Sequence, residues 1–150
     1  MATSTLLQKL DPVADGFGAT TSHRRQTEMF IANGAIAAGD WVMFDTTKTG
    51  ADRVLNVIEA VGGGTGTGLV VGVSTQAAAA GERVKVVVAG YAEGASVANA
   101  VAGAAVPLVV DATAAGQAVA IAAGDLAPPC GISLEAAAGN LCDVMVYKNF

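Results

Sequence analysis

The chain has 150 residues, a formal net charge of -5, and a composition that is 53% hydrophobic but only 5% aromatic. This length provides one domain with a modest core, and the negative charge argues against a dedicated nucleic-acid-binding protein. The first residues lack a basic region followed by a long apolar one, so no secretory signal is expected. The uncharged stretch 94–110 is interrupted by Gly and Pro and is too short for a comfortable membrane span.

Small side chains, chiefly alanine and valine, make up most of the apolar content. Each of them buries little area, at about 25 cal/mol per Å², so the core is expected to be thin. From Val61 onward charged residues are sparse, which suits a surface that neighbours partly cover. We therefore expect a homo-oligomer, or a chain docked on a larger assembly, because either would add to stability.

The N-terminal segment, residues 1–25, differs from the rest of the chain. It is rich in Thr, Ser, Asp and Gly and shows no sustained periodicity, which predicts an extended arm that becomes ordered only on a partner. The arm ends in His23, Arg24 and Arg25, which are its candidate contact residues. Residues 26–150 are expected to form one β domain.

Nine short segments after the arm show the apolar alternation and the flanking turn residues of β-strands. In chain order they cover residues 27–32, 39–45, 53–60, 69–74, 82–91, 104–111, 116–122, 130–134 and 141–150. Roughly eight or nine short strands predict an all-β fold, either a β-sandwich or a barrel. Helix content should be low.

Three local features add detail to this pattern. In the second segment, Trp41 and Met43 should lie on one face of the strand, and Val42 and Phe44 on the other. The third segment, 53–60, is expected to form a hairpin with the second. The alanine run 77–80 is long enough for a short helical turn, which Gly81 would stop.

One phrase occurs twice in the chain, nearly sixty residues apart. From Gly72 the sequence is GVSTQAAAAGERVKVVV, and from Gly131 it is GISLEAAAGNLCDVMVY. The alternate apolar positions of the two strands correspond, and they are expected to face the core: Val84, Val86 and Val88 in the first copy, and Cys142, Val144 and Val146 in the second. The intervening Lys85 and Asp143 should face solvent. The repeat predicts a β domain built from two related halves.

A weaker echo is the phrase IAAGD, which occurs at residues 36–40 and again at 121–125. In β proteins such a phrase commonly marks the turn that enters a strand, because Gly bends the chain and Asp accepts hydrogen bonds from backbone N–H groups. It indicates architecture and carries little information about function.

Candidate catalytic and binding motifs are weak. The glycine run 62–68 leads into a strand without the Lys and Ser or Thr of a phosphate-binding loop, so a hairpin loop is favoured. Ser74 and Ser133 lie outside any G-x-S-x-G motif, and the single histidine has no cysteine partner nearby for a metal site. The two cysteines, Cys130 and Cys142, are expected to be reduced and buried, with a disulfide between them less favoured. No catalytic, cofactor or metal site is predicted, and the chain is not expected to be an enzyme.

The phrases LVVGVSTQAAAAGERVKVVVAGYAEG and GISLEAAAGNLCDVMVY resemble the small decoration, or cement, proteins of tailed-bacteriophage heads. The resemblance covers residues 29–147 and consists of a pattern of Ala, Gly and Val. It implies a β-rich structural protein of the virion that binds the major capsid protein on the outer capsid surface, clamps adjacent capsomers, and is assembled in the host cytoplasm. It also implies a trimer, and an arm that contacts the shell through residues such as His23, Arg24 and Arg25. No cofactor and no active site carry over.

Other functions remain open at this point. The chain could be another virion component, such as a fibre base or a tail protein. A small-molecule-binding β-barrel would need a concave pocket, which Trp41 could line. A hydrolase with an unrecognised site is a further alternative.

Overall fold

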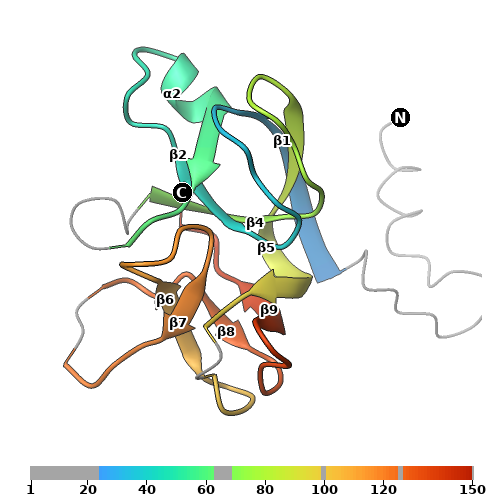
Figure 1. Ribbon diagram of the computed structural model, residues 1–150, viewed down its shortest axis with the longest axis vertical. Coiled ribbons are helices and arrows are strands. Elements are labelled where there is room, and N and C mark those ends of the chain that lie inside the picture. The colour runs from blue at the N-terminus through green and yellow to red at the C-terminus, as the bar shows by residue number, and fades with distance from the viewer. Residues whose placement is uncertain (1–23, 63–68, 99–100, 125–126, 150) are drawn as a thin grey trace, which may run out of the picture.

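The computed structural model describes residues 24–62, 69–98, 101–124 and 127–149 (Figure 1). In these residues the strands are β1 (Arg25–Ala32), β2 (Trp41–Phe44), β3 (Asn56–Glu59), β4 (Val70–Ser74), β5 (Arg83–Ser96), β6 (Pro107–Val110), β7 (Ala118–Ala120), β8 (Gly131–Ser133) and β9 (Leu141–Val146). One helical turn, α2 (Asp52–Leu55), precedes β3. The predicted all-β fold with eight or nine short strands is confirmed, and it is of the barrel type.

The first five strands close into a barrel. The strand order is β1-β3-β2-β4-β5-β9-β8-β6-β7, and β1 also pairs with β5. Because β1 is parallel to β3 on one side and antiparallel to β5 on the other, it joins the two edges of this five-stranded sheet. The barrel forms the upper half of Figure 1, and β6 to β9 form the lower half.

The second half repeats the pairing of the first. The order β3-β2-β4-β5 recurs as β7-β6-β8-β9. The registers correspond as well: Ser74 pairs with Val86 between β4 and β5, and Ser133 pairs with Val144 between β8 and β9. The two copies of the repeated phrase are therefore two equivalent hairpins, and the prediction of two related halves is confirmed.

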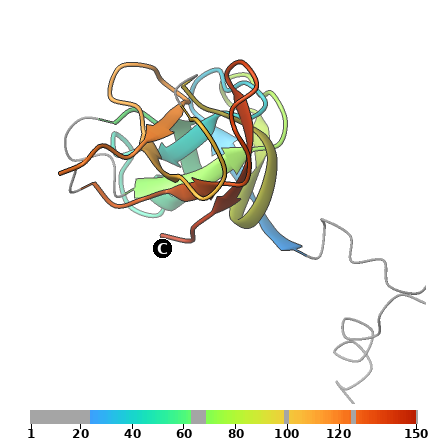
Figure 2. The ribbon, with the colours of Figure 1, turned by 90° about the horizontal axis from the view of Figure 1, so that it is seen from below.

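Strand β5 is shared between the halves. Its first part pairs with β1, and its second part, from Gly90 to Ser96, pairs with β9 and takes the place that β1 has in the barrel. Beyond it, Val97 forms a parallel bridge with Ala118, which corresponds to the parallel pair Ala32–Val57 of the first half. In Figure 2 the second half lies in front of the first, and β5 curves from one into the other.

The six alternate positions of the repeat are all buried, but in two different cores. The interior of the first barrel contains Val84, Val86 and Val88, and a second cluster contains Cys142, Val144 and Val146. Val87 points away from the first interior and is nevertheless buried, in the second cluster.

The second cluster also joins the halves. Trp41, Val73 and Val87 come from the outer face of the first barrel and pack with core residues of the second half. Trp41 is completely buried, and a Cβ at Gly131 would lie 2.9 Å from its indole ring. This position therefore suits glycine, because the strand β8 passes so close to the ring.

Three sequence expectations need correction. Residues 52–55 form α2, so the strand expected over 53–60 is shortened to β3. The alanine run forms no helical turn, because Ala78 makes a β-bridge with Ile36. The IAAGD echo is not a structural equivalence, since its first copy leads into β2 and its second follows β7. In the part of the chain that the structure describes, no helix is long and apolar enough to cross a membrane.

Candidate functional site

The predicted arm residues lie where the described chain begins. His23, like all of residues 1–23, lies outside the described residues, and Arg24 is exposed. Arg25, which was assigned to the arm, is the first residue of β1 and pairs with Gly90 at the middle of β5. Gly90 has φ +88°, and a Cβ there would lie 2.0 Å from the carbonyl oxygen of Arg24. The chain thus enters the fold tightly packed between the two halves.

A groove of about 330 Å³ opens at this junction. Its lining residues come from both halves of the molecule, namely Arg25, Ala38, Gly39, Val73, Ser74, Thr75, Val87, Ala92, Glu93, Gly94 and Leu141. Ser74, one of the polar lining residues, is buried and donates its hydroxyl to the carbonyl of Ala37 at 2.5 Å. Its hydroxyl is therefore occupied in holding the backbone, as is that of Ser133, which donates to the carbonyl of Gly103 at 2.7 Å.

A more apolar groove lies beside α2. Its volume is about 390 Å³ and its walls include Phe44, Val54 and Leu69. Val54 is 57% exposed and Leu55 is 49% exposed. The connection that carries α2, residues 45–55, is longer than the corresponding connection 111–117 between β6 and β7. The sequence pattern gives no sign of this surface, because Val54 and Leu55 also fit a strand.

Two aspartates occupy equivalent turns and have a structural role. Asp45 follows β2 and accepts hydrogen bonds from the N–H (2.9 Å) and hydroxyl (2.7 Å) of Thr47. Asp111 follows β6 and accepts the same pair of bonds from Thr113 at 2.7 and 2.8 Å. These bonds favour the ionised carboxylate and lower the pKa of both aspartates below the usual value. The turns are therefore stabilised in the same way in both halves.

Asp143 departs from the sequence expectation. It was expected to face solvent, like Lys85 at the equivalent position, but it is half-buried. Its carboxylate accepts the hydroxyl of Tyr91 at 2.7 Å and the N–H of Gly94 at 3.0 Å. The bond to Asp143 and partial burial raise the pKa of Tyr91 to about 12. Because Gly94 lies in the irregular stretch of β5, these bonds hold the bend by which that strand passes into the second half.

The cysteines and the remaining carboxylate with a shifted pKa also belong to the packing of the fold. Cys130 and Cys142 are free and buried, and burial raises the pKa of Cys130 to about 12, so its thiol stays protonated. Burial and the neighbouring Asp40 raise the pKa of Glu59. Among the described residues, no group of three or more His, Cys, Asp and Glu is placed to hold a metal ion.

Comparison with models of known protein families finds no match, and none of the curated proteins matches the sequence. Solved structures are similar in fold. A chain from the capsid of Myoviridae phage XM1 is 16% identical with a TM-score of 0.63, over 87% of this chain and 88% of that one. The N base of head fibre gp8.5 of bacteriophage phi29 is 15% identical with a TM-score of 0.50, over 82% of this chain and 94% of that one. The fold defined by the nine strands is therefore one that also occurs in proteins of phage heads.

Proposed function

We propose that the chain is a structural protein of a tailed-bacteriophage head, which binds the outer capsid surface and clamps adjacent capsomers. The observation that carries this proposal is the likeness to the XM1 capsid chain, which spans nearly the full length of both proteins. A structural role needs contact area and shape complementarity, without a set of catalytic groups. Its partner would be the major capsid protein, and its place the virion, after assembly in the host cytoplasm.

The proposed mode of attachment uses the N-terminal segment together with the body of the protein. The segment enters the fold at Arg24 and Arg25, between the two halves, so a contact there would place both halves on the shell. An arm that becomes ordered on binding loses conformational entropy. Multivalent contact between several copies and a lattice offsets that loss. We propose that three copies act together as a trimer.

The apolar groove beside α2 offers a second contact for the shell. Exposed Val54 and Leu55 stand next to this groove, and such apolar exposure is typical of surfaces that bind another protein.

A head-fibre base is the second candidate, supported by the likeness to the phi29 protein, 94% of which is matched. In that case the chain would anchor a projecting fibre. The small-molecule alternative loses its main support, because Trp41 is completely buried and lines no open pocket.

The test is co-sedimentation of the purified protein with expanded heads that lack it, followed by electron microscopy of the decorated heads. Added density spread over the shell at many equivalent positions is expected for a decoration protein. Density at the foot of projecting fibres would favour the fibre base. A chain that stays in the supernatant with expanded heads at micromolar concentration would refute both.

A further inference from the structure

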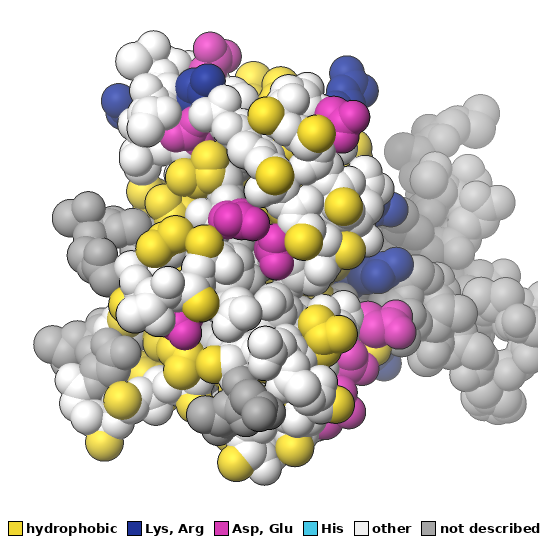
Figure 3. Space-filling view, in the orientation of Figure 1, with side chains coloured by type: hydrophobic (Ala, Val, Ile, Leu, Met, Phe, Trp, Pro, Cys, Tyr) yellow, Lys and Arg dark blue, Asp and Glu magenta, His cyan; other side chains and the backbone are white. Residues whose placement is uncertain are grey.

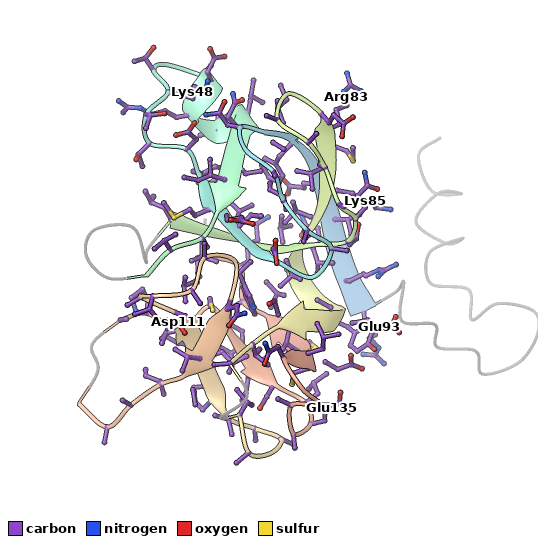
Figure 4. All side chains as sticks on the ribbon, in the orientation of Figure 1. Lys48, Arg83, Lys85, Glu93, Asp111 and Glu135 are labelled. Carbon is purple, nitrogen blue, oxygen red and sulfur yellow. The ribbon has the colours of Figure 1, made fainter. Side chains whose placement is uncertain are left out.

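One side of the molecule carries opposite charges on its two halves. Arg83 and Lys85 lie on the first part of β5, with Ile31 and Met29 of β1 paired beside them. We call these four residues the basic strip. Glu93 on the second part of β5 and Glu135 after β8 lie on the same side of the second half (Figure 4). Leu141 lines the same groove as Glu93, and Leu134 precedes Glu135 in the chain. We call these four the acidic strip.

The space-filling view shows a partial separation of charge along this side. Dark blue side chains lie along the right edge of the upper half with a magenta group among them, and magenta side chains gather along the right edge of the lower half, where blue ones reach their upper end (Figure 3). The internal repeat accounts for only part of this contrast. Val86 and Val144 hold equivalent pairing positions, so Lys85 of the basic strip corresponds to Asp143, which is engaged within the fold. The charges of the acidic strip come instead from the second part of β5 and from the segment after β8.

The charged ends of the basic strip are available for a partner. Arg83 and Lys85 are exposed, and neither side chain forms a salt bridge or hydrogen bond with the described residues. The acidic residues nearest to them are already engaged. Glu82 accepts the N–H of Ala79 at 2.8 Å, and Glu28 lies 3.9 Å from the ammonium group of Lys148.

The acidic strip is exposed as well. Glu93 and Glu135 are both exposed, and the carboxylate of Glu135 accepts only a long bond, 3.3 Å, from the N–H of Asp143. Arg25 lies between the strips and lines the same groove as Glu93. The centre of this side is therefore mixed in charge, and positive and negative side chains are most clearly separated at its two ends, which the two strips occupy.

Each strip also carries exposed apolar area. Met29 is 53% exposed and Leu141 is 51% exposed. Exposed single ion pairs contribute little, so apolar contact beside the charges is needed for a stable interface, with the charges supplying orientation and partner choice. Both strips have this composition.

We propose that the basic strip of one copy of this chain binds the acidic strip of another copy. The charges of the two strips are opposite and each strip has apolar residues beside its charges, so a second copy of this chain supplies the complementary strip that each one lacks. A contact between two different strips is heterologous, and such contacts give a closed ring when the rotation between neighbours closes; the proposed trimer is a ring of this kind. The inference rests on the proposed function only for the number of copies, since the contact itself does not need a shell.

The experiment is sedimentation equilibrium of the full-length chain at about 0.05 M and about 0.5 M salt, because exposed charge pairs are screened as salt rises. We expect oligomers at low salt and a dissociation constant at least about tenfold weaker for Arg83→Glu/Lys85→Glu. Glu93→Lys/Glu135→Lys should weaken it equally. The variant that carries all four changes keeps the net charge at -5 and should regain assembly. The single variant Lys85→Glu should also weaken assembly, and Lys48→Glu, which makes the same charge change away from both strips, is its matched control and should assemble as the wild type does (Figure 4).

Mixing the two double variants tests the number of copies. The two chains complement each other in pairs, but a ring of three always places two like chains side by side. We therefore expect the mixture to form dimers and the wild type to form trimers. If the wild type forms dimers instead, the contact between the two strips stands but the ring of three copies is wrong. A monomer at low salt and high concentration, or failure of the four-change variant to regain assembly while circular dichroism shows it folded, would overturn the contact. Binding of heads is measured separately, so these results leave the proposed function to its own test.

Discussion

Asp143 provides the sharpest test of how the second half is held together. Its carboxylate joins Tyr91 and Gly94, at the bend where β5 passes from the first half into the second. The equivalent residue in the first half, Lys85, makes no side-chain bond with the described residues. Substitution of the two residues by alanine should therefore have very different effects, although they occupy matching places in the repeat.

The magnitude follows from the bonds that are lost. A hydrogen bond contributes about 1 kcal/mol net to stability, and more when one partner is charged. Because Asp143 is partly exposed, the extra contribution from its charge is reduced by solvent. Asp143→Ala removes two such bonds, so the free energy of unfolding should fall by about 2 kcal/mol. Asp143→Asn keeps the shape of the side chain and should cost about 1 kcal/mol, and Lys85→Ala should stay within about 0.5 kcal/mol of the wild type.

Urea unfolding followed by circular dichroism measures these differences, and tyrosine titration provides an independent check. In a Tyr147→Phe background Tyr91 is the single remaining tyrosine, so its ionisation can be followed by ultraviolet absorbance. Its pKa of about 12 should fall toward 10.0 in Asp143→Asn. Since the folded pKa is the higher one, the stabilisation due to Tyr91 is complete below pH 10.0 and is lost as pH rises toward about 12. Equal stability of Asp143→Ala and Lys85→Ala, or an unchanged tyrosine pKa, would refute this account.

Three further predictions concern the cores and the chain entry. Val86→Asp and Val144→Asp should each lower the free energy of unfolding by about 3 to 5 kcal/mol in urea unfolding, because each buries an unpaired charge in its own core; a loss below about 1 kcal/mol would contradict the assigned burial. Gly90→Ala should lower the melting temperature by several degrees, about 1 to 3 kcal/mol, since it combines a positive φ with a close approach to Arg24; an unchanged melting curve would contradict that geometry. Deletion of residues 1–23, which stops short of β1, should leave the circular dichroism spectrum nearly unchanged and weaken co-sedimentation with heads, whereas full binding by the truncated chain would exclude the arm as a clamp.

The repeated hairpin shows how far the sequence could predict the fold. The alternation in GERVKVVV and GNLCDVMV is a local property, and a strand with one apolar face is its direct physical consequence. The burial of Val86 and Val144 follows from it. The burial of Val87 does not, because it depends on a second half that packs against the outer face of the first barrel. The turns at Asp45 and Asp111 are also equivalent, but Asp, Thr and small residues are too common in loops for the match to stand out.

The candidate contact surfaces depend on register and on long-range pairing. Arg83, Lys85, Glu93 and Glu135 are scattered charges in the sequence, and only the pairing of β5 with β1 and β9 places them on one side. The groove beside α2 arises because residues 52–55 turn as a helix where a strand pattern was expected. Side-chain spacing alone could not distinguish these outcomes, since Val54 and Leu55 suit either structure.

The sequence by itself therefore determined the all-β class, the positions of the strands and the existence of two related halves, because alternation and turn residues act over a few neighbours along the chain. The tertiary structure decided that β1 closes the first barrel, that β5 is shared, and that Asp143 is bonded to Tyr91 and Gly94 while Lys85 at the matching position is exposed. These outcomes depend on contacts between residues far apart in the chain, and the free energy of such contacts comes from burying both faces of β5 between the two cores.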